Sequence, residues 1–317
     1  MNVFDRIRAA CRAVAEQARF VRVEESRLEP CARALLAAEA PRSDPAHQRR
    51  ATPEATLAYV VTLDAVNFGS GWFPFLRKRP GCSGYFTVAL ALAERFDARG
   101  PWSAAELREI EAAELARVLG QDLAVPEVRE LVGLFATALR DLGGLLDARY
   151  AGSFAALVEA AGGRAACLVE LLAEMPFYRD VSILDGREVP FYKRAQITAA
   201  DLHLAFEGRG AGRFGDLDSL TIFADNLVPH VLCLEGVLVY EPALVQRIEA
   251  GELLAPGSRE EVEIRACALD AVERLGVAAA RLGRETPAWR LDEILWWRGQ
   301  RPEFKARPRH RTRSVFY

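Results

Sequence analysis

The sequence predicts a mainly α-helical, multi-helical protein with one short β-hairpin near residues 181–191. Apolar residues recur at helical spacing through most of the 317 residues. Helix-start patterns repeat along the chain, including the capping boxes Ser103-x-x-Glu106 and Ser258-x-x-Glu261. The dipeptide Asp185-Gly186 lies between two β-prone runs and is a strong hairpin signal. This hairpin is the one β element that the sequence predicts.

The composition is that of an ordinary globular protein with a sizeable core. Half of the residues are hydrophobic (51%) and 27% are charged. A chain of 317 residues suits one large domain or two intimate ones. The formal net charge of -3 argues against duplex nucleic acid as the main partner, because binding to phosphates needs a basic surface. We therefore expect no stable nucleic-acid partner.

The cysteines and the N-terminal segment favour a cytoplasmic protein. None of the six cysteines forms a C-x-x-C pair or has metal-ligand spacing with a histidine. They are typical of small buried side chains in a reducing compartment. The N-terminal segment carries charges throughout and does not resemble a signal peptide. No apolar run approaches the ~20 residues that span a bilayer, so we expect no membrane association.

The first half of the chain shows successive helices separated by polar or glycine-containing breaks. Thr52-Pro53 supplies a hydroxyl cap followed by proline in the first turn. The predicted elements are helices over 3–18 and 27–39, a polar loop over 39–50, and helices from 53, from 83, over 103–119, 126–142, 153–161 and 165–175. We find no chemistry in the part after residue 83 and interpret it as scaffold.

The stretch Asp64–Phe75 interrupts this pattern with glycines, a proline and a cluster of aromatic side chains. Phe68 and Trp72 lie there beside Asp64 and Asn67. Two interpretations stay open. The aromatic side chains either close the core at a helix end or form a wall against a planar ligand.

The stretch 189–234 carries most of the residues suited to chemistry. It contains a predicted helix over 192–206, a glycine-rich connector over 207–215, a helix capped by Asp218 and another with Pro229 in its first turn. Beyond it we expect helices over 242–250, from Ser258 and over 289–297. Asp225 stands out in the apolar run I-F-A-D-N-L-V, because burying an acid is costly unless it is paired or hydrogen-bonded.

Several motifs resemble the queuosine salvage family, the queuosine 5'-phosphate N-glycosylase/hydrolases. The longest is F-Y-K-R-A-Q-I (residues 191–197). The others are D-A-V-N-F (64–68), Gly84-Tyr85, F-Y-R-D-V (177–181), F-A-D (223–225), E-V-E-I-R (261–265), the L-D-x-x-L-W around Asp292 and the C-terminal H-R-x-R. Two positions depart from the family pattern: Trp297 stands where an acid is expected, and His203 stands where an aromatic residue is expected.

The resemblance implies a fold and an activity. The fold is helical, with a likeness to helix-hairpin-helix DNA glycosylases. The activity is hydrolysis of the N-glycosidic bond of queuosine 5'-phosphate, which releases queuine for tRNA modification, with no cofactor and no metal. We expect a single compact unit over 1–317, which can be divided into a helical scaffold lobe (1–175) and a catalytic glycosylase-like lobe (176–317).

Asp225 and Lys193 are the predicted catalytic residues. Cleavage of an N-glycosidic bond builds positive charge on the sugar, and a carboxylate beside the anomeric carbon stabilises it, orients water or attacks as a nucleophile. Asp225 is the candidate for this role. Lys193 can contact the sugar or phosphate, hold Asp225 ionised or form a Schiff base.

The other predicted residues would bind the substrate. Phe68, Trp72, Phe223 and Trp296 are candidate walls for the base, and Asn67 lies among the first two. Asp292 or Asp64 can pair with the cationic secondary amine of queuine. His230, at a predicted helix start, is a candidate for the 5'-phosphate or a capping or core residue. Asp201 can act in the site or pair with Lys193 or Arg194. Glu261, Glu263 and Arg265 are most simply a charge network on their own helix.

Two other classes of function stay open from the sequence. A helix-hairpin-helix type DNA or RNA base glycosylase is favoured by the basic C-terminal tail and disfavoured by the net charge. A non-catalytic helical interaction protein is disfavoured by the acid in I-F-A-D-N-L-V and by the aromatic-rich turn.

Overall fold

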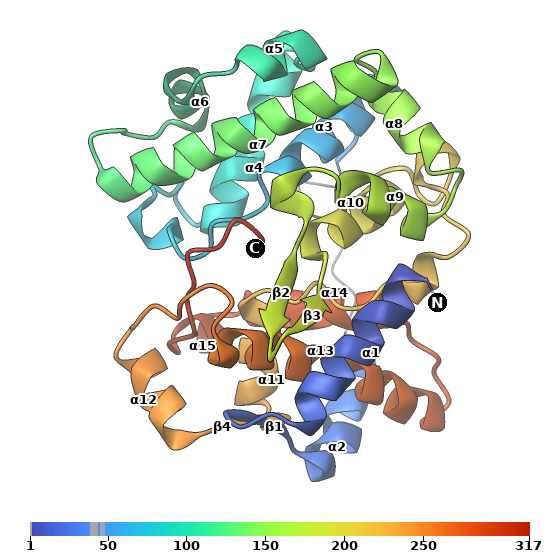
Figure 1. The fold of residues 1–317 in the computed structure, drawn as a ribbon, viewed down its shortest axis with the longest axis vertical. Helices are drawn as coiled ribbons and strands as arrows, with labels where there is room; N and C mark the ends of the chain where they lie inside the picture. The colour runs from blue at the N-terminus through green and yellow to red at the C-terminus, as the bar shows by residue number, and fades with distance from the viewer. Residues whose placement is uncertain (1, 39–43, 45–47) are drawn as a thin grey trace. The chain divides into compact units, whose positions relative to one another are not determined.

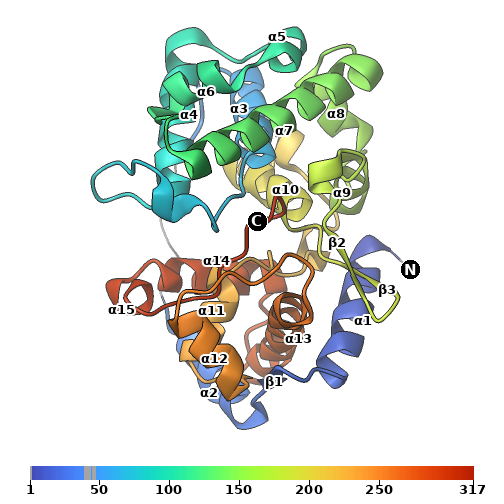
Figure 2. The same ribbon diagram turned by 60° about the vertical axis from the view of Figure 1, so that its left-hand side comes forward.

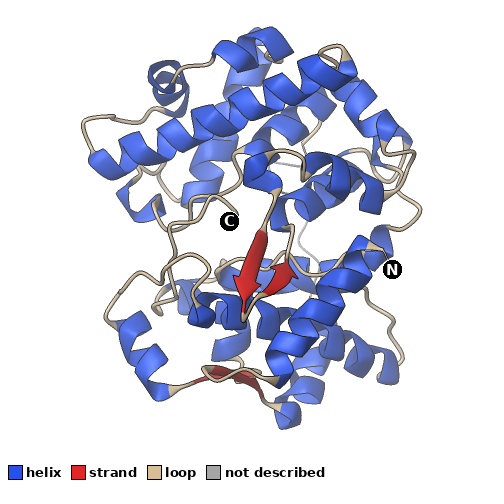
Figure 3. Cartoon of the chain, in the orientation of Figure 1, coloured by secondary structure: helices blue, strands red, loops and turns tan. Residues whose placement is uncertain are grey.

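The computed structural model describes residues 2–38, 44 and 48–317, and these residues are predominantly helical (Figure 1). The β structure of the described residues consists of two short antiparallel strand pairs (Figure 3) and one isolated bridge between Leu253 and Arg311. The predicted mainly α fold class with a hairpin near 181–191 is therefore confirmed. The described part of the chain contains no helix with the length and apolar character needed to cross a bilayer.

The chain forms two compact units, each assembled from several stretches. Unit 1 comprises Met1–Arg42, Asp180–Lys193 and Asp218–Arg313, and unit 2 comprises Ser43–Arg179, Arg194–Leu217 and Ser314–Tyr317. Each unit is described by itself below. The predicted lobes 1–175 and 176–317 stay a prediction.

Unit 1 is built around the long helix α13, which is buried along most of its length. Ser258 caps its first turn, and α1, α2 and α14 pack against it (Figure 1, Figure 2). The elements of unit 1 are α1 (Val3–Glu16), β1 (Val21–Val23), α2 (Glu25–Leu36), β2 (Val181–Leu184), β3 (Arg187–Pro190), α11 (Leu227–Leu234), β4 (Leu238–Tyr240), α12 (Pro242–Glu249), α13 (Arg259–Arg281), α14 (Ala288–Gly299) and α15 (Pro302–Lys305).

The predicted hairpin is present as β2 and β3. Asp185 and Gly186 both have positive φ (49° and 75°), as a two-residue hairpin turn of this kind requires. The strand β3 leads directly to Lys193, so the hairpin fixes the entry of the chain into the helix that follows.

The sequence did not predict the second sheet, in which β1 pairs antiparallel with β4. Val21 lies opposite Tyr240 and Val23 opposite Leu238. Each strand has three residues, which is too short for an alternating apolar pattern to be recognised.

Unit 2 is helical and contains most of the predicted scaffold. Its helices are α3 (Pro53–Ala65), α4 (Gly84–Arg99), α5 (Ala104–Glu109), α6 (Ala112–Leu119), α7 (Pro126–Tyr150), α8 (Phe154–Ala160), α9 (Ala165–Leu172) and α10 (Lys193–Ala205), whose first residue belongs to unit 1. The long helix α7 packs against α5, α6, α3 and α8 (Figure 1).

Three predicted elements differ in the structure. The helix expected over 103–119 is broken at Ile110, whose extended backbone presents its carbonyl to Arg140 (3.1 Å). The helix expected over 126–142 continues to Tyr150. Asp218 caps no α-helix; its carboxylate accepts the indole N–H of Trp289 (3.3 Å). The loop expected over 39–50 lies mostly outside the described residues.

The helix α7 contains two consecutive glycines, Gly143 and Gly144, whose surroundings differ. A Cβ on Gly143 would lie 2.7 Å from the Ala104 carbonyl oxygen and 2.8 Å from the Arg108 nitrogen, whereas one on Gly144 would meet nothing within 4 Å. Gly143 is therefore the position where α5 approaches α7 closely, and Gly144 only weakens the helix.

The glycine pair gives a matched test of this packing. We expect Gly143→Ala to lower the free energy of unfolding by about 1–3 kcal/mol through overpacking. We expect Gly144→Ala to raise it by about 0.5–1 kcal/mol through helix propensity. Urea denaturation of both variants measures the difference, and a Gly143→Ala variant as stable as Gly144→Ala would contradict the close approach.

Candidate active site

Four of the predicted site residues come together in unit 1: Lys193, Phe223, Asp225 and Asp292. Asp292 Oδ1 accepts the backbone N–H of Phe223 (2.9 Å). The charges of Asp225 and Lys193 both act on the Asp292 carboxyl group, the first raising and the second lowering its pKa. The structure thus gathers both predicted catalytic residues and one predicted base-binding acid in one place.

Asp225 is held by the start of helix α11. Its Oδ1 accepts the backbone N–H groups of Leu227 (2.7 Å) and Val228 (3.0 Å). These are donors that a helix N-terminus leaves without helical partners, and the helix dipole there favours a negative charge. The carboxylate is half-buried, and Oδ2 lies outside both bonds. The two bonds to Oδ1 fix the side chain.

Asp292 has a different environment. Its side chain is buried in α14, and burial together with the neighbouring Asp225 charge raises its pKa well above the usual carboxyl value. The protonated form is therefore favoured, and it can donate a hydrogen bond. This favours a donor role for Asp292 over the expected pairing of a carboxylate with the queuine amine.

Lys193 is buried at the first position of α10, and its backbone is anchored on Asp180. The N–H of Lys193 donates to Asp180 Oδ2 (3.1 Å), and the N–H groups of Phe191 and Tyr192 donate to the Asp180 carbonyl (2.9 and 3.2 Å). Tyr192 has a φ of 47°, which is strained for a residue with a bulky side chain. A strained backbone held by several bonds just before Lys193 indicates a fixed position for that residue.

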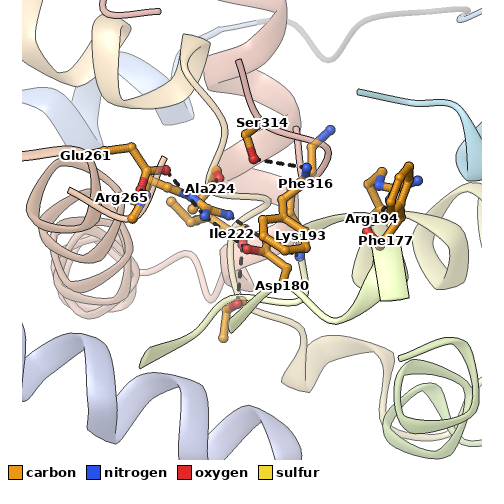
Figure 4. A network of polar contacts seen from close by, with 12 residues as sticks. Phe177, Asp180, Lys193, Arg194, Ile222, Ala224, Glu261, Arg265, Ser314 and Phe316 are labelled. Atoms are coloured by element: carbon orange, nitrogen blue, oxygen red, sulfur yellow. Dashed lines mark hydrogen bonds and ion pairs between the residues drawn. The ribbon is translucent and has the colours of Figure 1, made fainter. Parts of the chain in front are cut away.

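Asp180 is in turn bound by Arg265 of α13, and both side chains are only 1% exposed. Arg265 Nη1 and Nη2 lie 3.0 and 2.6 Å from the two Asp180 oxygens, and Nε donates to the carbonyl of Ala224 (2.9 Å). Figure 4 shows Arg265 between Asp180 and Glu261, which lies 3.5 Å from Nη1. The guanidinium also stacks on the Phe191 ring. The expectation that Arg265 belongs to a network on its own helix was incomplete, because its main partners lie at residues 180 and 224.

Arg309 is a further residue near Asp225 that the sequence analysis did not single out. Burial lowers the pKa of its guanidinium, and the Asp225 charge opposes that effect. The basic tail was noted, but nothing in its pattern distinguishes Arg309 from the other arginines there.

His230 and Trp296 also lie in unit 1. His230 Nε2 donates to the Phe304 carbonyl (2.9 Å), and burial lowers the pKa of the imidazole. A neutral ring whose N–H is already bonded favours the core role of His230 over binding of phosphate. Trp296 is half-buried and packs edge-to-face with Trp297 (5.2 Å between centroids).

The remaining predicted residues belong to unit 2. Asp64 is fully buried at the end of α3, and Asn67 Nδ2 lies 3.4 Å from its Oδ1. Phe68 is 1% exposed and packs edge-to-face against Phe135 and Phe177. This burial favours the core interpretation of Phe68.

Trp72 and Asp201 also have defined places in unit 2. The Trp72 indole N–H donates to Glu130 (2.7 Å), and its ring is 3% exposed. Asp201 is buried in α10, and its charge contributes to the raised pKa of Tyr85. The neighbour of Lys193, Arg194, donates to the carbonyl of Ala65 (2.6 Å) and stacks on Phe68 and Tyr178.

Comparison with known proteins finds one matching family, described as queuosine salvage protein, over residues 46–317. A protein from Sphaerobacter thermophilus named queuosine 5'-phosphate N-glycosylase/hydrolase is 40% identical over 83% of this chain and 82% of its own. Two other similar proteins carry the same name. The one from Mus musculus is 33% identical over 98% of this chain and 98% of its own, and the one from Dictyostelium discoideum is 33% identical over 83% of this chain and 79% of its own.

The raised pKa of Asp292 predicts a pH-dependent stability. Above the ordinary carboxyl pKa the unfolded state releases a proton that folded Asp292 retains, so the stability of the wild type falls as pH rises toward the folded pKa. Asp292→Asn removes this penalty and can still accept the Phe223 N–H. We expect its melting temperature to exceed that of the wild type at about pH 7, with a gain that shrinks toward about pH 4.

Differential scanning calorimetry over this pH range measures the effect. Glu235→Gln is the control, because Glu235 is a partly buried carboxylate of unit 1 whose partner, Arg298 (2.7 Å), lies on the same helix as Asp292. A gain for Asp292→Asn that is independent of pH would show that Asp292 is not the titrating group.

Proposed function

The chain belongs to the queuosine salvage protein family, and we propose that it hydrolyses the N-glycosidic bond of queuosine 5'-phosphate and releases queuine for tRNA modification. The observation that carries the proposal is the placement of Asp225 at the N-terminus of α11, with Lys193 and Asp292 beside it. The Asp225 carboxylate is thus fixed next to a lysine and next to an acid whose pKa is raised, an arrangement suited to stabilising positive charge on a sugar.

In the proposed reaction, the bond between the anomeric carbon and the base nitrogen breaks, and its electron pair leaves with the base. Positive charge develops on the sugar, and the fixed Asp225 carboxylate stabilises it. Water supplies a hydroxyl group to the anomeric carbon and a proton to the base nitrogen. The helix N-terminus at which the carboxylate lies favours a negative charge.

The base is a 7-deazaguanine, which has no N7 to protonate. Stabilisation of the leaving group must then come from donors to other acceptors of the base. A protonated Asp292, held by the Phe223 N–H, is such a donor. Phe223, half-buried and bonded through its N–H to Asp292, is a candidate wall residue for the base.

The anionic part of the substrate needs cations. Lys193 and Arg309 are cations whose charges act on carboxylates of this site, the first on Asp292 and the second on Asp225. We assign sugar or phosphate contacts to them in preference to His230. The proposal requires no metal and no cofactor, and it places the protein in the cytoplasm without a stable nucleic-acid partner.

Asp225→Asn is the variant that tests the proposal. The amide oxygen can still accept the N–H groups of Leu227 and Val228, so the cap of α11 is kept while the negative charge is lost. We expect the turnover number on queuosine 5'-phosphate to fall by about 10³-fold, as for loss of a principal electrostatic group. Chromatographic quantification of free queuine, with and without EDTA, measures it.

Asp216→Asn is the matched control. Asp216 also receives two backbone N–H groups at a helix start, from Ala165 (2.6 Å) and Ala166 (3.2 Å), but it lies in unit 2. We expect this variant to retain full activity. Full activity of Asp225→Asn, or no queuine release by folded wild-type protein, would contradict the proposal, and salt-sensitive oligonucleotide binding would then favour a DNA or RNA glycosylase.

The role of Lys193 can be tested separately. The proposed hydrolysis needs no covalent bond to lysine, so borohydride present during turnover should leave the protein at its own mass. Intact-mass spectrometry checks this. An adduct of one sugar on Lys193 would instead show a Schiff-base mechanism.

A further inference from the structure

We infer that Arg265 is a positioning residue for the reaction: its guanidinium holds the backbone at both Lys193 and Asp225 in their working places. The inference rests on the proposed function. It concerns a buried residue of α13 that itself contacts neither the substrate nor the reacting atoms.

Arg265 reaches the chain next to Asp225. Its Nε donates to the carbonyl oxygen of Ala224 at 2.9 Å, and both residues are buried. Ala224 is joined by one peptide bond to Asp225. The side chain of Asp225 is fixed by α11 on the other side, through Leu227 and Val228. Arg265 therefore fixes the chain just before the carboxylate, where α11 does not.

Arg265 also holds the backbone at Lys193, through the carboxylate of Asp180. Arg265 binds both oxygens of Asp180 in a fork, at 3.0 and 2.6 Å. One of these oxygens, Oδ2, also accepts the Lys193 N–H at 3.1 Å. A planar guanidinium matches a carboxylate in this bidentate geometry, which a lysine cannot reproduce. Rotation of Asp180 would therefore displace the start of α10.

Glu263, two residues before Arg265 on the same helix, has different partners. Glu263 is also fully buried, and its Oε2 accepts the N–H groups of Arg19 (2.9 Å) and Phe20 (2.7 Å). These contacts anchor the segment between α1 and β1, which carries none of the proposed catalytic residues. Glu263 thus anchors the segment between α1 and β1, whereas Arg265 binds the backbone at both proposed catalytic residues.

The consequence for catalysis follows from geometry. A carboxylate displaced by about 1 Å from the developing charge loses on the order of 10²-fold in rate. The loss falls on the transition state, because the charge that Asp225 stabilises is not yet present in the bound substrate. Loss of Arg265 should therefore lower kcat more than it raises KM.

Arg265→Lys is the test, with Glu263→Gln as the matched control. Arg265→Lys keeps the positive charge and loses the fork and the Nε contact. We expect kcat for queuine release to fall by about 10²-fold with KM changed by less than about 3-fold. Glu263→Gln should keep kcat within about 2-fold of the wild type. Both are assayed well below their own melting temperatures, so that loss of stability does not enter the rates.

A double-mutant cycle separates positioning from a general structural role. In the Asp225→Asn background, positioning residue 225 has little left to contribute, so the cost of Arg265→Lys should shrink to less than about 10-fold. Glu263→Gln should have the same small effect in both backgrounds.

The inference is overturned if Arg265→Lys loses no more activity than Glu263→Gln, or if its full loss persists without Asp225. Should Arg265→Lys fail to fold, Asp180→Asn replaces it in the comparison with Glu263→Gln. It breaks the fork but keeps the Nε contact to Ala224, so we expect a smaller loss of kcat, of about 10-fold, and an unchanged kcat would overturn the inference. An inactive wild type would overturn the proposed function, whereas an active wild type with an unaffected Arg265→Lys would overturn this inference alone.

Discussion

The site in unit 1 depends on one buried ion pair, between Asp180 and Arg265. Both side chains are 1% exposed. Removing one partner of such a pair leaves an unpaired buried charge and costs about 3–5 kcal/mol. A hydrophobic pair of similar volume can be as stable as an ion pair, so stability alone does not account for it. The contacts of the pair account for it, because the pair binds the backbone that enters α10 and the backbone that precedes α11.

Around this pair, two carboxylates are placed in opposite environments. Asp225 lies at a helix N-terminus, half-buried, where negative charge is favoured. Asp292 lies in a buried position beside it, where its pKa is raised. Neighbouring carboxylates whose environments differ in this way can divide the work of charge stabilisation and proton donation. The positive charges of Lys193 and Arg309 act on Asp292 and Asp225, respectively.

Local signals in the sequence predicted most helices and the hairpin at Asp185-Gly186, because each depends on neighbours close in the chain. The group of Lys193, Asp225 and Asp292, which are distant in sequence, was predicted from the family motifs instead. The pairing of β1 with β4 was missed, since it joins two short segments far apart in sequence. The bond from Arg265 to Asp180 was missed for the same reason: 85 residues separate the partners, and no periodicity indicates which buried acid an arginine will meet. Burial of Phe68 and Trp72 likewise depended on packing that an aromatic-rich turn leaves open.

The central claim is that the Asp225 carboxylate faces the anomeric carbon of a bound nucleotide. A crystal structure of the Asp225→Asn variant with queuosine 5'-phosphate tests it most directly. We predict that the side chain of residue 225 lies about 3–3.5 Å from the anomeric carbon or from a water that contacts it. A sugar bound away from residue 225, with another carboxylate beside the anomeric carbon, would contradict the account.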